Sequence, residues 1–73
     1  MNYTEFVRQF PEGKEIGRDI TDEEVAVYCD NGTDVGIWRQ DRRTTCGKGE
    51  VLSHTDAEMA RHWFHRQTIT VSR

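Results

Sequence analysis

The chain has 73 residues, of which 34% are apolar and 32% charged, with a formal net charge of −3. A domain of this size buries only roughly 60% of its unfolded surface, which leaves little room for a deep catalytic cleft. No apolar run approaches the ~20 residues that a membrane helix needs, and the N-terminus lacks the basic start and apolar stretch of a signal peptide. We therefore expect one domain, residues 1–73, in the cytoplasm, with Cys29 and Cys46 reduced.

The charge is divided unevenly along the chain. Residues 1–36 carry nine acids against three bases, and residues 37–73 carry four acids against seven bases. A dipolar surface of this kind orients a charged partner as it approaches, although acids also simply keep a surface solvated.

The N-terminal segment predicts a short helix. Thr4 is the expected N-cap, Phe6 and Phe10 lie on one apolar side, and Pro11 ends the helix. The polar segment 12–21 contains two glycines, so we interpret it as a connection.

Residues 22–43 allow two interpretations. Val25–Cys29 and Val35–Arg39 are rich in β-branched and aromatic residues and flank an Asn-Gly turn, which favours a β-hairpin. With helical periodicity, the same segment becomes a helix-turn-helix in which residues 34–43 would contact DNA. We favour the hairpin and retain the DNA-binding protein as the alternative.

The C-terminal third predicts a strand, a helix and a last strand. Glu50–Ser53 forms the candidate third strand, and Thr55 with Glu58 fits a capping box. A helix over 56–66 would bury Ala57, Ala60, Trp63 and Phe64 against the sheet, and Thr68–Val71 alternates like a strand. The predicted fold class is α+β, with a small antiparallel sheet of three to four strands, one main C-terminal helix packed on it and a short N-terminal helix.

Metal binding and catalysis have weak support in the sequence. The cysteines lie 17 positions apart, and His62 and His65 are the only close pair of ligand types, a spacing that argues against structural zinc. No nucleophile motif, phosphate-binding glycine loop or metalloprotease motif is present. We expect no enzyme activity, no cofactor and no metal.

Protein binding has some positive support, because Tyr, Trp and Arg are the residues that most often anchor interfaces. A basic loop follows Trp38, and a thin core leaves one or two aromatic side chains for a partner. Our candidate protein-binding residues are Arg39, Arg42, Arg43, Trp38 and Tyr3.

Over its whole length, and from the opening Met1-Asn2-Tyr3-Thr4-Glu5-Phe6, the chain resembles the small RNA-polymerase-binding transcription regulators of lytic phages of Xanthomonas. The resemblance includes no diagnostic motif. It implies a non-enzymatic protein, expected as a monomer, that binds the host RNA polymerase, inhibits transcription initiation and suppresses termination. It also implies a location in the bacterial host cell, where the polymerase could bring the protein to DNA indirectly.

Overall fold

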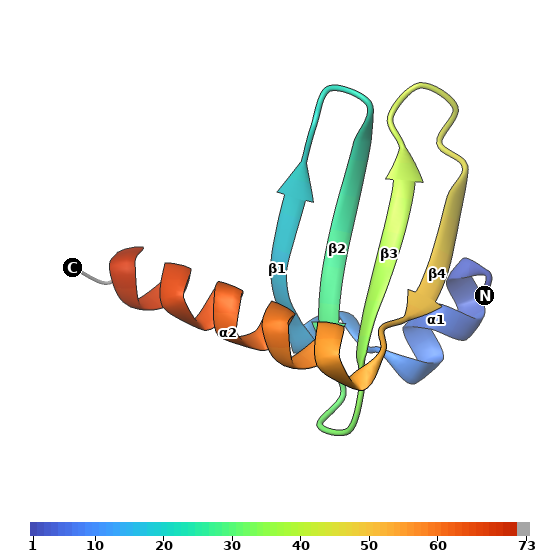
Figure 1. Cartoon of the computed structure of the whole chain (residues 1–73). Coiled ribbons are helices and arrows are strands. Elements are labelled where there is room, and N and C mark those ends of the chain that lie inside the picture. Colours follow the sequence, from blue (N-terminus) through green and yellow to red (C-terminus); the bar gives the residue numbers. More distant parts are fainter. Residues whose placement is uncertain (72–73) are drawn as a thin grey trace.

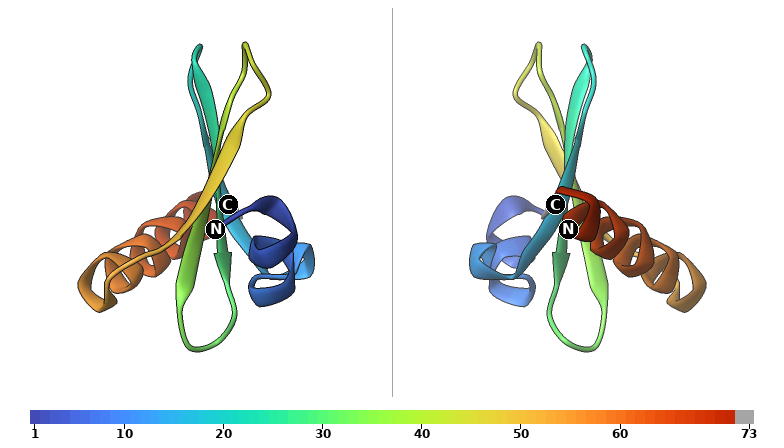
Figure 2. Two further views of the ribbon diagram at one scale, coloured as in Figure 1. Left: turned by 90° about the vertical axis from the view of Figure 1, so that its right-hand side faces the viewer. Right: turned by 90° about the vertical axis from the view of Figure 1, so that its left-hand side faces the viewer.

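Four consecutive strands form an antiparallel sheet of order β1-β2-β3-β4, with one helix on each face (Figures 1 and 2). The computed structural model describes the backbone of residues 1–71 and the side chains of residues 1–66. The predicted α+β class is confirmed, and four strands are present. The elements are α1 (Tyr3–Gln9), a 3₁₀ turn (Glu12–Lys14), β1 (Glu15–Ile20), β2 (Glu24–Asp30), β3 (Val35–Asp41), β4 (Gly47–Val51) and α2 (His54–Val71).

The first helix begins earlier than predicted. Asn2 is the N-cap, and its side-chain oxygen accepts the backbone N–H of Glu5 at 2.9 Å. The prediction of Thr4 as the cap is therefore wrong, because Asn2 caps as well as Thr does and stands two residues earlier. Phe6 and Phe10 are buried, as expected for the apolar side.

Strand β1 corrects the interpretation of residues 12–21 as a connection. Residues 17–20 pair directly with β2, and a bulge lies between Glu15 and Gly17. Only Ile16 and Gly17 are half-buried, so the strand lacks the alternating apolar pattern from which a strand is usually recognised. Gly17 is required here because a Cβ at this position would overlap the Phe64 ring of α2.

The central hairpin is confirmed. Val27 pairs with Trp38 and Tyr28 with Ile37 in an unbroken antiparallel register. In the turn, the Asn31 side chain accepts the backbone N–H groups of residues 33 and 34, at 3.0 and 2.7 Å. Gly32 has a φ of +93°, a conformation that favours glycine.

Strand β4 was predicted at Glu50–Ser53 but lies at Gly47–Val51. Its two glycines, which argued against a strand, make close packing possible. A Cβ on Gly47 would overlap the Trp38 ring, and one on Gly49 would lie 2.8 Å from the Phe6 ring. Glycine in a strand thus marks a close approach of side chains from another element.

Helix α2 is longer than predicted and begins with a different cap. The Ser53 hydroxyl oxygen accepts the backbone N–H of Asp56 at 3.2 Å, in the place expected for Thr55. The last strand predicted at Thr68–Val71 is wrong, because the backbone there continues the helix. Adding residues to an existing helix avoids the free-energy cost of helix nucleation. This advantage outweighs the β propensity of the four residues.

The core lies in two layers, one on each side of the sheet. On the α1 side, Phe6, Phe10, Cys29 and Trp38 form one buried cluster. On the α2 side, the buried cluster consists of Val35, Ala57 and Ala60, with Ile16, Tyr28 and Leu52 packed against it. Both helices cross the same end of the sheet, so the other end, with the β1–β2 and β3–β4 turns, has no helix on either face (Figure 2).

Candidate protein-binding surfaces

The two predicted aromatic site residues lie together. The rings of Tyr3 and Trp38 meet edge to face with centroids 5.2 Å apart. Tyr3 is 52% exposed, and its hydroxyl donates to a carboxylate oxygen of Glu12 at 2.9 Å, which raises the Tyr3 pKa. Trp38 is only 8% exposed and packs on Phe6, so its main role is in the core.

Of the three predicted arginines, only Arg42 lines the same cleft as these rings. Arg39 lies in the α2-side groove described below, and it pairs with Glu24 at 3.5 Å. Arg42 folds back on the β1–β2 turn, where a guanidinium N–H donates to the carbonyl of Thr21 at 2.8 Å. Arg43 is exposed in the β3–β4 turn. The structure therefore distributes the five candidate residues over both faces and one end of the sheet.

A cleft of about 470 Å³ lies on the α1 side of the sheet. Tyr3, Trp38, Val25 and Val27 contribute to its apolar lining, and its charged side chains are Glu12, Glu15, Arg18, Asp41 and Arg42. Cys29 also lines it, but burial raises the pKa of this thiol, so it is protonated at neutral pH and a poor nucleophile. The cleft thus brings together three of the five predicted site residues, Tyr3, Trp38 and Arg42.

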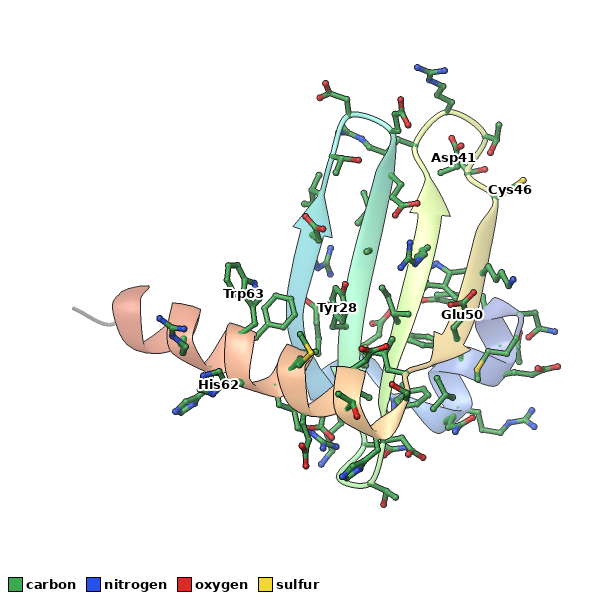
Figure 3. All side chains as sticks on the ribbon, in the orientation of Figure 1. Tyr28, Asp41, Cys46, Glu50, His62 and Trp63 are labelled. Carbon is green, nitrogen blue, oxygen red and sulfur yellow. The ribbon has the colours of Figure 1, made fainter. Side chains whose placement is uncertain are left out.

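A second, shallower hollow of about 750 Å³ lies on the opposite side, between α2 and the sheet. We call it the α2 groove. Met59 is 65% and Trp63 57% exposed, the largest exposures among the apolar residues of the groove. In Figure 3, Trp63 rises from α2 on the outer side of β1, whereas Tyr28 lies on β2. The groove is lined by Arg18, Asp19, Tyr28, Ile37, Arg39, Leu52, Asp56, Met59, Ala60, His62, Trp63, Phe64 and Arg66.

The exposure of Trp63 corrects its predicted place in the core. Ala57, Ala60 and Phe64 are buried on the sheet, as predicted. At about 100° per residue, Met59 and Trp63 lie roughly a third of a turn around α2 from the centre of that stripe. The helix thus carries two apolar stripes, and the sheet covers one of them. The angular separation of the stripes was a usable signal for this second site, but the sequence interpretation merged them.

An ion pair fixes α2 relative to the β2–β3 turn. Arg61 donates from two nitrogens to the Asp30 carboxylate, at 2.8 and 3.2 Å, and from one of them to the carbonyl of Thr33 at 3.3 Å. The hydrogen bond from Arg61 holds the pKa of Asp30 below its ordinary value, and the N–H of Gly32 adds to this effect. The position of Trp63, two residues after Arg61, is therefore set by a side-chain contact as well as by packing.

The strand that borders the groove carries a second ion pair. Arg18 donates to both carboxylate oxygens of Glu15, at 2.8 and 2.9 Å, and this hydrogen bonding lowers the pKa of Glu15. Both side chains are partly exposed, so the pair orders the β1 surface more than it stabilises the fold.

Metal ligands do not converge in the part of the chain that the structure describes: no group of three or more His, Cys, Asp or Glu side chains could hold an ion there. Both cysteines are free. Among residues 1–71, no helix has the length and apolar character needed to cross a bilayer.

Comparisons with known proteins give no relative for this chain. No family model, no curated protein and no solved structure matches it.

Proposed function

We propose that the chain is a phage-encoded, non-enzymatic regulator that binds the host bacterial RNA polymerase, inhibits transcription initiation and suppresses termination. The proposal begins from the whole-chain resemblance to small polymerase-binding regulators of lytic phages. It names the α2 groove, which contains Trp63, as the principal contact surface.

The observation that carries the proposal is the exposure of Trp63 and Met59 next to each other on α2. Tryptophan is strongly enriched among the residues that dominate protein interfaces, and methionine adapts to irregular surfaces. Burying the exposed part of one such side chain contributes on the order of 1–2 kcal/mol to binding. The groove also carries charged residues of both signs at its border, as protein interfaces usually do.

The uneven distribution of charge would orient the protein as it approaches a charged partner surface. In the sheet order, the acidic half of the sequence forms β1 and β2, and the basic half forms β3 and β4. The acidic β1–β2 turn and the basic β3–β4 turn lie at the same end, where Arg42 donates its backbone N–H to the carbonyl of Glu23 at 2.9 Å. A polymerase surface with adjacent basic and acidic patches would attract this end in one orientation.

The helix-turn-helix alternative lacks its structural basis. Residues 34–43, which would have formed the recognition helix, lie in β3 and the turns that flank it. We therefore do not propose DNA reading through this segment.

The experiment is a binding test with a matched pair of variants. The immobilised protein is exposed to nuclease-treated Xanthomonas lysate, and affinity is then measured with purified core polymerase. We expect polymerase subunits to be retained and Trp63→Ala to weaken binding about tenfold, which corresponds to ~1.4 kcal/mol. His65→Ala is the control, because His65 is also exposed on α2 but is absent from the groove lining. Equal effects of the two substitutions, or no retained polymerase, would contradict the proposal.

A further inference from the structure

The outer edge of β1 offers unpaired backbone groups. Thr21 donates its N–H to the carbonyl of Glu24 at 2.9 Å, which defines a hydrogen-bonded pair at the end of the first hairpin. Hydrogen-bonded and non-hydrogen-bonded pairs alternate along antiparallel strands, so Ile20 and Arg18 direct their N–H and C=O groups away from β2. Within residues 1–71, no backbone group outside β2 pairs with these groups.

The opposite edge of the sheet differs. Gly49 of β4 exchanges two backbone hydrogen bonds with Met1, at 2.8 and 2.9 Å. The N-terminus therefore occupies the middle of the β4 edge. An exposed strand edge is a template for pairing with another chain, and here the unoccupied edge is that of β1.

Apolar side chains border the free edge on both faces of the sheet. Ile20 is 59% exposed and shares the α1 side with its neighbour Val25. On the α2 side, helix α2 continues past β1, and Trp63 lies on the part of the helix next to that strand (Figures 1 and 3). Successive side chains of an added strand point to opposite faces. They would meet Ile20 on one face and Trp63 on the other.

The charge around this edge favours one kind of added strand over another. Residues 12–24, which comprise β1, its flanking turns and the first residue of β2, carry six acids against two bases. Pairing the β1 edges of two copies would bring these acidic segments together. A basic segment is attracted instead.

We propose that β1 pairs, through Arg18 and Ile20, with an extended segment of a polymerase subunit that carries basic residues and at least one apolar side chain for contact with Trp63. This inference rests on the proposed function and specifies its binding mode. Strand addition obtains affinity from main-chain hydrogen bonds and specificity from side chains on both faces.

Ile20→Pro tests the pairing directly. Proline removes the outward N–H of residue 20 but none of the hydrogen bonds to β2, and proline is tolerated at such edge positions. Ile20→Ala is the matched control, because alanine keeps the N–H and removes at least as much side chain. We expect Ile20→Pro to weaken binding of purified core polymerase at least tenfold more than Ile20→Ala does. Melting curves of both free variants verify that they fold.

Amide hydrogen exchange of the wild-type protein gives a second readout that does not depend on a variant. The amides of Arg18 and Ile20 should exchange at least about tenfold more slowly in the polymerase complex than in the free protein. Tight binding of Ile20→Pro, together with unprotected amides, would overturn strand addition and leave the proposed function intact. No binding by the wild type would overturn both. A dimer of the free protein that Ile20→Pro dissociates would identify a second copy as the occupant and overturn this assignment.

Discussion

At the scale of single residues, glycine determines how closely the helices approach the sheet. Gly17 lies under Phe64, Gly36 under Phe10, and Gly47 under Trp38, and a Cβ at each position would overlap the ring above it. The core of this small protein depends on a few aromatic rings that pack closely against glycine positions. Such positions tolerate no added methyl group unless a ring moves.

Replacement of Gly17 tests this packing. Gly17→Ala should lower the free energy of unfolding by about 1–3 kcal/mol, because the new Cβ displaces the Phe64 ring. Gly13→Ala is the control, since a Cβ there meets no atom within 4 Å, and its effect should stay within about 0.5 kcal/mol. Urea denaturation followed by fluorescence measures both. Equal stability of the two variants would show that Phe64 does not pack on β1.

At the scale of elements, the contact between α2 and the β2–β3 turn depends on Asp30 and Arg61. The folded-state pKa of Asp30 lies below its ordinary value, chiefly because of the hydrogen bond from Arg61. The stabilisation is therefore fully present above the unfolded-state pKa of about 3.9, and it is lost as the pH falls through the lower folded-state pKa.

Asp30→Asn isolates this contribution. At pH 7 the substitution should lower the free energy of unfolding by about 1 kcal/mol, and the difference from the wild type should shrink as the pH falls below about 4. Denaturation curves at a series of pH values measure it. Asp19→Asn, at an exposed position of β1, serves as the control and should show no comparable difference. A difference for Asp30→Asn that stays constant to pH 2 would contradict the role of its ionised carboxylate.

How far the sequence predicts the elements depends on how each one is stabilised. The hairpin of β2 and β3 is encoded locally, by β-branched residues around an Asn-Gly turn, and was predicted correctly. Strand β1 pairs along its backbone but has few apolar side chains, and β4 contains two glycines that serve packing from another element. Backbone pairing with a neighbouring strand and packing of rings from other elements leave no local sequence pattern. For this reason β1 was missed and β4 was misplaced.

The same distinction applies to the candidate sites. Tyr3 and Trp38 are in contact, as a shared site requires, but Arg39 lies on the opposite side of the sheet from them, because neighbouring residues of a strand face opposite ways. We assigned Trp38 and Arg39 to one site because they are neighbours in the sequence, but in strand β3 their side chains lie on opposite faces of the sheet. Trp63 lay within the predicted helix, but its exposed stripe was merged with the buried one. The free β1 edge was missed because residues 12–21 were interpreted as a connection.

At the scale of the whole molecule, one side of the sheet combines three features of a binding surface. The exposed Trp63 and Met59 belong to α2, which runs past the unpaired edge of β1 (Figure 1), and the acidic segment 12–24 contains β1. The opposite edge is occupied by the N-terminus. This asymmetry leads us to place the principal contact of the proposed polymerase complex here, and to give the turns at the far end of the sheet only a role in orienting the approach.

The most direct test of the proposed function is transcription with purified Xanthomonas polymerase on a template that has a promoter and an intrinsic terminator. Protein added before promoter binding should reduce transcript initiation, and protein added to elongating complexes should increase the fraction of transcripts that pass the terminator. Trp63→Ala should raise the protein concentration that gives half of each effect about tenfold. His65→Ala should leave that concentration unchanged. Unchanged initiation and unchanged termination at saturating protein would contradict the account.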